Sequence, residues 1–259
     1  MSSERSWNRG GVVLTGWEHA GPGPTVILLH GWCCDRGFLE PQIEHLASLG
    51  HHVVAFDQRG HGGSGWNGES IDIGVFADDV AWLIEELGLG RAMIAGHSMG
   101  GLVALELANR RAELVERIAL LDSIVAIPPD LTGAVEGLSL LLDSPRCADT
   151  IDEFIRKWLV TDQTDRVLVD RVVETMRSAP REVAVDCWRS LVTYDDRGAL
   201  KACPVPMLFV AAGNSVSRLE ELPDMNPGLE LACIRGASHF LTLEAPDATN
   251  ELLERFFRP

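Results

Sequence analysis

The sequence predicts an α/β protein with a mostly parallel central sheet, helices on both faces and an inserted helical cap. Short apolar runs alternate with helical periodicity over much of the 259 residues, and such runs are typical of parallel strands buried on both sides. Residues 124–200 differ because they contain helical periodicity without a convincing strand. A Gly-His-Ser-Met-Gly motif at residues 96–100 directly follows one apolar run.

The elements follow in an alternating order. Strands are expected at 12–15 (an edge strand), 25–29, 52–56, 92–95, 117–121, 207–211 and 229–234. Core helices are expected at 38–49, 73–87, 102–108 and 248–257, and cap helices at 135–142, 151–159, 166–176 and 183–192. We therefore expect a core of residues 1–123 and 201–259 and a cap of residues 124–200. A cap above the carboxyl ends of the strands is where a pocket should form.

Charge and composition exclude several classes of partner. The formal net charge of −16 argues against nucleic acid and anionic membrane surfaces. The N-terminal residues lack the apolar segment of a signal peptide, and no apolar run is long enough to span a bilayer. Six cysteines without C-x-x-C spacing indicate reduced thiols and a cytoplasmic protein. We expect a small-molecule substrate, no cofactor and no metal; the oligomeric state stays open.

The motif at residues 96–100 predicts a nucleophile elbow, in which a strand, a tight turn and a helix present Ser98 at the apex. Glycines at both ends of the motif allow a strained turn and a close approach of neighbouring chain. The alternative is a small-residue turn that only packs a helix on the sheet. Because the strand before and the helix after are both expected, we interpret Ser98 as a catalytic nucleophile.

A serine nucleophile needs a base and two donors for the developing oxyanion. His239 follows the last expected strand, which is the position in chain order that suits the base. The backbone N–H of Met99 and that of Trp32, in the loop after strand 25–29, are the expected oxyanion donors. His30 in the same loop is interpreted chiefly as a hydrogen-bonding structural residue.

The acid of the triad is less obvious. The segment after strand 207–211 contains no carboxylate before Glu220 and Glu221, which suggest the start of an exposed helix. Asp122 ends the strand next to the elbow strand and could reach the far nitrogen of His239. We therefore assign Asp122 as the acid, with a turn or helix-capping aspartate as one alternative and the two glutamates as the other.

The remaining candidates are weaker. The run Asp-Gln-Arg-Gly-His-Gly at 57–62 is expected to close a turn and satisfy buried backbone groups. Pocket contacts are proposed for residues of the oxyanion loop and for aromatic residues of the cap, although aromatic side chains at helical spacing are more often core residues. These candidates are His30, Cys33, Trp158, Trp188 and Tyr194.

Together these motifs resemble the α/β-hydrolase superfamily from about residue 25 to the C-terminus. The resemblance rests on His30-Gly31, the motif at 57–62, the elbow and Ser238-His239-Phe240. It implies the fold and a hydrolytic serine, but it does not imply a particular substrate. A serine rather than an aspartate at the elbow differs from haloalkane dehalogenases and epoxide hydrolases, whose nucleophile is a carboxylate.

A narrower resemblance leads to a second function. The loop His30-Gly31-Trp32-Cys33, the acid at Asp122 and the region of Trp158 are similar to cofactor-independent 2,4-dioxygenases that cleave 3-hydroxy-4-quinolone rings with O₂. In that family the histidine deprotonates the substrate and no acyl-enzyme forms. The leading hypothesis is a serine hydrolase of a small carboxylic ester or lactone, with the dioxygenase second and a non-catalytic ligand-binding module third.

Overall fold

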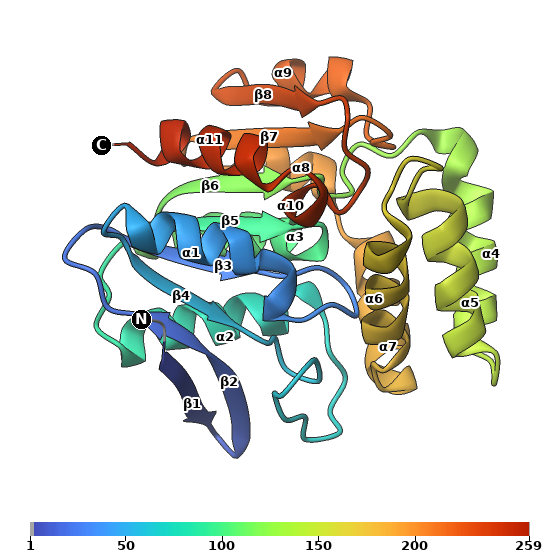
Figure 1. The fold of residues 1–259 in the computed structure, drawn as a ribbon, viewed down its shortest axis with the longest axis horizontal. Coiled ribbons are helices and arrows are strands. Elements are labelled where there is room, and N and C mark those ends of the chain that lie inside the picture. Colours follow the sequence, from blue (N-terminus) through green and yellow to red (C-terminus); the bar gives the residue numbers. More distant parts are fainter. Residues whose placement is uncertain (1–2, 259) are drawn as a thin grey trace.

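The computed structural model describes residues 3–258 and contains an eight-stranded sheet with the order β1-β2-β4-β3-β5-β6-β7-β8 (Figure 1). The strands are β1 (Ser3–Arg9), β2 (Val12–His19), β3 (Thr25–Leu29), β4 (His52–Phe56), β5 (Ala92–His97), β6 (Val115–Leu121), β7 (Met207–Ala212) and β8 (Leu229–Ile234). Strand β2 pairs antiparallel with both β1 and β4, and all other pairs are parallel. The predicted α/β class with a mostly parallel sheet is confirmed.

Helices cover the sheet on both faces because its central strands are apolar on both sides. In β3, Val26 and Leu28 join one buried cluster with side chains of α1 (Glu40–Ser48) and α11 (Pro246–Phe257). The intervening Ile27 and Leu29 join the other cluster, which includes side chains of α2 (Ile73–Glu86) and α3 (Met99–Arg110). This alternation is the two-residue period of a strand.

The first strand, β1, is not expected from the sequence. Its polar residues give no apolar run, and the expected edge strand is limited to residues 12–15. In the structure β1 pairs with β2 over its whole length, through a turn in which Gly10 and Gly11 both have positive φ angles. The hairpin forms by backbone pairing and leaves the side chains of β1 exposed or half-buried, so hydrophobic periodicity could not reveal it.

Four helices lie together beyond the carboxyl ends of the strands (Figure 1). These cap helices are α4 (Thr132–Leu142), α5 (Cys147–Phe154), α6 (Arg166–Arg177) and α7 (Arg181–Thr193). A 3-10 turn (Pro129–Leu131) precedes α4, and a π-helical turn (Ile155–Leu159) follows α5. The next helix, α8 (Asp196–Ala202), packs on α3, where Asn109 donates a hydrogen bond to the carbonyl of Ala199 (3.0 Å). The short α9 (Leu222–Met225) and α10 (Leu241–Glu244) lie between later elements.

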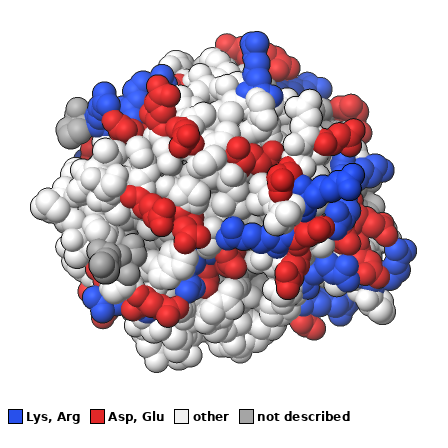
Figure 2. All heavy atoms as spheres, in the orientation of Figure 1, with Lys and Arg blue, Asp and Glu red and all other residues white. Residues whose placement is uncertain are grey.

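Charges of both signs are interspersed over the cap helices (Figure 2). Arg156 pairs with Asp152 at 2.6 Å, and Arg177 pairs with Asp149 at 3.1 Å. These exposed pairs add little to stability, because solvent screens them. In the described part of the chain, no helix combines the length and apolar character needed to cross a membrane.

Candidate active site

The elbow at Ser98 is a strained turn that two glycines make possible. Ser98 has φ 53° and ψ −117° and stands between β5 and α3. A Cβ atom on Gly96 would lie 2.1 Å from the carbonyl of Gly100, and one on Gly100 would lie 2.3 Å from the carbonyl oxygen of Leu29. Larger residues at either position would therefore collide with backbone, which explains both glycines of the motif.

The turn leaves backbone donors near the serine. Ser98 itself is tied to the neighbouring strand, because its N–H donates to the carbonyl of Leu121 at 2.9 Å. Within residues 3–258, the N–H groups of Trp32 and Met99 have no protein acceptor. Trp32 and Ser98 line the same small cavity, and Met99 begins α3. Two free backbone donors, one of them at the N-terminus of a helix, suit an oxyanion.

The expected acid and base are in direct contact. Nδ1 of His239 donates to Oδ2 of Asp122 at 2.7 Å, while Oδ1 of Asp122 accepts from the N–H of Ala212 at 2.9 Å. Burial alone would raise the pKa of the Asp122 carboxyl. The hydrogen bond from His239, the charge of His239 and the hydrogen bond from the N–H of Ala212 together outweigh burial, so this pKa lies below its usual value. Asp122 is therefore a carboxylate that fixes the orientation of His239 and leaves Nε2 free to accept a proton.

Two contacts hold the backbone of His239 from opposite sides. Its N–H donates to the carbonyl of Leu159 in the π-helical turn at 3.1 Å. Its carbonyl accepts from Nε2 of His97, the residue before the elbow serine, at 2.8 Å. Burial, together with the nearby imidazole of His239, lowers the pKa of His97 to about 3, so His97 is a neutral donor.

Glu244 holds the residue before His239. Its carboxylate accepts hydrogen bonds from the hydroxyl and the backbone N–H of Ser238, the latter at 3.2 Å. The hydroxyl of Thr164, between the π-helical turn and α6, donates to the same carboxylate at 3.2 Å. This network joins the histidine loop to the cap. The sequence does not predict this network or the contact of His97 with His239, because residues that are far apart in the chain leave no local pattern when they pair.

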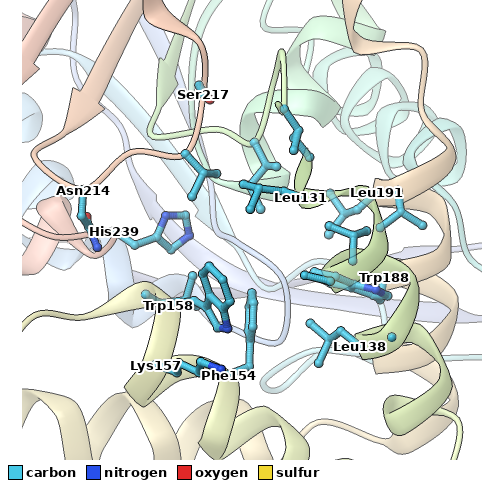
Figure 3. Close-up of a pocket in the computed structure, with 18 of the residues that line it drawn as sticks. Leu131, Leu138, Phe154, Lys157, Trp158, Trp188, Leu191, Asn214, Ser217 and His239 are labelled. Atoms are coloured by element: carbon cyan, nitrogen blue, oxygen red, sulfur yellow. The ribbon is translucent and has the colours of Figure 1, made fainter. Parts of the chain in front are cut away.

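His239 lies where two cavities meet. The larger has a volume of about 380 Å³ and is lined by side chains of α4, α5, the π-helical turn and α7 (Figure 3). The smaller leaves about 10 Å³, room for about one water molecule, beside Ser98 and Trp32. Among the expected contacts, Trp158 lines the larger cavity and Trp188 lines both.

Three of the expected pocket residues lie elsewhere. The hydroxyl of Tyr194 donates to Glu106 at 2.9 Å in a separate surface groove. Cys33, in the left-handed region with φ 57°, does not line either cavity; its neighbour Cys34 lines the smaller one. His30 also lies outside both cavities. These three positions are corrections to the sequence interpretation, which could not resolve side-chain directions within a loop or at a helix end.

His30 has the structural, hydrogen-bonding role that the sequence chiefly predicts for it; only the weaker expectation of a pocket contact is wrong. Its Nε2 accepts from the N–H of Gln58 at 2.9 Å, and its Nδ1 donates to the carbonyl of Gly31 at 2.8 Å. Burial lowers the pKa of His30 to about 4. The run at 57–62 is structural as predicted, because Arg59 forms two 2.6 Å hydrogen bonds with Asp79 in the core.

This sheet order, with an elbow serine after β5, defines an α/β-hydrolase fold. A model of the family described as "Alpha/beta hydrolase family" matches residues 26–252. The chain therefore belongs to this family. The family assigns the protein to the hydrolases without specifying its substrate.

Individual relatives cover nearly the whole chain. It is 25% identical over 268 residues to 3-oxoadipate enol-lactonase 1 of Acinetobacter baylyi, with 100% of this chain and 96% of that protein covered. It is 23% identical over 261 residues to a 2-(acetamidomethylene)succinate hydrolase of Mesorhizobium japonicum, covering 95% and 92%.

Solved structures support the fold. The enol-lactonase from Burkholderia xenovorans LB400 superposes with a TM-score of 0.86 at 23% identity, over 97% of this chain and 99% of that one. A bromoperoxidase from Bacillus anthracis superposes with a TM-score of 0.87 at 21% identity, over 100% of both chains. Likeness at this identity establishes the architecture and leaves the substrate to be argued from the site.

Proposed function

We propose that the protein is a serine hydrolase of a small carboxylic ester or lactone, acting through an acyl-enzyme on Ser98. The observation that carries the proposal is the 2.7 Å hydrogen bond from His239 to Asp122, with His239 lining the cavity that contains Ser98. The nucleophile Ser98 follows β5, the acid Asp122 follows β6, and the base His239 lies in the loop after β8. Their chain order, serine, acid and histidine, is that of the α/β-hydrolase arrangement.

In the first half of the reaction, Nε2 of His239 takes the proton of Ser98 as its Oγ attacks the carbonyl carbon. The N–H groups of Trp32 and Met99 would stabilise the oxyanion, and Asp122 the imidazolium. His239 then gives the proton to the departing alkoxide oxygen. In the second half, His239 activates a water molecule, which releases the acid and restores Ser98.

The relatives add support for this class of substrate. An enol-lactonase by name opens a cyclic ester, which is an acyl transfer to water. The predominantly apolar lining of the larger cavity suits an uncharged small molecule. We therefore propose a neutral or weakly polar small-molecule ester or lactone.

A fluorophosphonate probe tests the nucleophile directly. We expect covalent labelling of Ser98, located by peptide mass spectrometry, and turnover of short p-nitrophenyl esters. Ser98→Ala should lose both, with its fold retained by circular dichroism. Absence of labelling together with absence of ester turnover would reject the hydrolase proposal.

A measurement of O₂ uptake distinguishes the alternative function, a ring-cleaving dioxygenase, from the hydrolase. The acid at Asp122 and the loop at residues 30–33 favour the dioxygenase as a second candidate. O₂ uptake with 3-hydroxy-4-quinolones that persists in Ser98→Ala would support ring cleavage with His239 as the base. No O₂ uptake across several such substrates would remove this candidate.

A further inference from the structure

The two cavities beside His239 differ greatly in size. Among the described residues, Ser98 and Trp32 line the smaller cavity and not the larger one. Asp122 lines the larger cavity and not the smaller one. His239 belongs to both, and the shared wall is completed by Ile124, Phe154, Leu159, Trp188 and Leu191. The smaller cavity is therefore on the serine side of the histidine, and the larger one is on its aspartate side.

The chemistry assigns the two halves of an ester to these sides. After Ser98 attacks, His239 must protonate the leaving oxygen, so the alcohol half lies against the imidazole. The carbonyl oxygen must face the N–H groups of Trp32 and Met99, which fixes the acyl half on the serine side. The alcohol half then extends past His239 into about 380 Å³, and the acyl half remains where about 10 Å³ is open.

The walls of the two cavities agree with this division. Cys34 and Met176 line the smaller cavity together with Ser98, and its volume of about 10 Å³ leaves little room for carbon atoms beyond the carbonyl. The larger cavity has aromatic side chains from α5, the π-helical turn and α7, namely Phe154, Trp158 and Trp188 (Figure 3). Aromatic walls favour a flat or ring-shaped apolar group.

The lining of the larger cavity also includes charged side chains of α5 and the π-helical turn. These are Glu153 and Lys157, and the ammonium group of Lys157 lies 5.4 Å from the centre of the Trp158 ring. Trp158 is 39% exposed, so the larger cavity borders solvent at this side chain. An apolar alcohol can therefore be released past Trp158 after the first half of the reaction, while the acyl group stays on Ser98.

We propose that the preferred substrates are open-chain esters of a short acid, of acetyl size, with a bulky ring-containing apolar alcohol. This inference rests on the proposed function and narrows it. The ester C–O bond breaks, the hydroxyl of water joins the acyl carbon, and a proton joins the alcohol oxygen. The products are a short carboxylic acid and the free apolar alcohol.

Two substrate series test the assignment. The first keeps the alcohol constant in 1-naphthyl acetate, butanoate and octanoate, and we expect kcat/KM to fall at least about tenfold from acetate to butanoate. The second keeps the acyl group constant in phenyl and 1-naphthyl acetate, whose leaving groups have similar reactivity, and we expect the larger alcohol to be preferred. A rise in kcat/KM with acyl length would overturn the assignment.

A substitution in the larger cavity should change the preference for the alcohol, and a substitution in the smaller cavity should change the preference for the acyl group. Leu138→Trp fills the larger cavity from α4 and should lower the naphthyl-to-phenyl ratio of kcat/KM by about tenfold. Leu140→Trp on the same helix is the matched control, because Leu140 is 79% exposed and lines neither cavity; both acetates should be hydrolysed as by the original protein. Equal effects of the two variants would count against the alcohol site.

Met176→Ala should enlarge the smaller cavity and raise the butanoate-to-acetate ratio by about tenfold. Because Met176 is buried in α6, Cys34→Ala provides a second enlargement if that variant unfolds. A folded enlarged variant with an unchanged ratio would reject the acyl site. Ester turnover with the opposite preferences would overturn only this inference, whereas no turnover and no labelling of Ser98 would overturn the proposed function as well.

Discussion

Nε2 of His97 donates a hydrogen bond to the backbone carbonyl of His239 at 2.8 Å, and the two imidazole rings lie 4.8 Å apart. His97 is also the residue that precedes Ser98. The last residue of β5 therefore helps to hold the loop that carries the proposed base, together with the contact of the His239 N–H with Leu159. A fully buried neutral imidazole suits this role because it donates without adding charge next to His239.

His97→Leu should lower kcat more than it changes KM. Loss of one neutral hydrogen bond is worth about 1 kcal/mol, or about fivefold in rate if the loss acts on the transition state. Steady-state kinetics on a short ester measure the effect. His61→Leu is the matched control, because His61 is also buried and lies outside both cavities. An equal fall of kcat in both variants would show a general loss of stability instead of positioning.

Asp122→Asn should lower kcat by roughly 10⁴-fold, the scale of loss when a triad acid is neutralised. The amide cannot stabilise an imidazolium and favours the wrong tautomer of His239. The comparison variant is Glu221→Gln, because Glu221 pairs at the surface with Arg197 at 2.7 Å and Arg218 at 2.9 Å. Retained activity in Asp122→Asn with loss in Glu221→Gln would reverse the assignment of the acid.

Local patterns predict much of the sheet and the central contact of the site. The elbow appears as five consecutive residues, and Asp122 follows from a strand end together with the missing carboxylate after β7. Both patterns involve residues that are close together in the chain, so they can be recognised from the sequence alone. Strand β1 could not be predicted because its stability comes from pairing with β2 and not from apolar side chains.

Contacts between distant residues account for what sequence reasoning missed. Glu244 and its partner Thr164 are 80 positions apart in the chain, and only the fold brings the histidine loop and the cap together. Cys33 and Cys34 could not be separated, because the direction of each side chain depends on the positive φ angle of Cys33. The position of Tyr194 in the cap favours a place in the pocket, but its contact with Glu106 of α3 turns it away.

Gly100→Ala should prevent formation of a stable elbow. Its Cβ would lie 2.3 Å from the carbonyl oxygen of Leu29, and Leu29 is held in the sheet by its pairing with Gly96 of β5. We expect a loss of several kcal/mol, measured as a lower midpoint of urea unfolding. Gly133→Ala in α4 is the control, because a methyl group added there would have nothing within 4 Å and alanine favours a helix. A stable Gly100→Ala variant would contradict the close approach.

Three buried histidines make stability fall as the pH is lowered from neutrality. Burial lowers the pKa of His30 to about 4 and those of His61 and His97 to about 3, whereas the unfolded value is about 6.5. The unfolded chain therefore binds more protons between these values, so the stabilising contribution is present above pH 6.5 and is lost toward the folded pKa values.

Between pH 7.5 and 5.5 each histidine should account for about 1.4 kcal/mol, and the three together for about 4 kcal/mol. Urea unfolding at the two pH values measures the difference in the free energy of unfolding. His61→Gln should reduce the difference by about a third, because it removes one of the three groups while leaving the proposed active site intact. An unchanged free energy between the two pH values, or the same dependence in His61→Gln as in the original protein, would show that these imidazoles are not held neutral by burial.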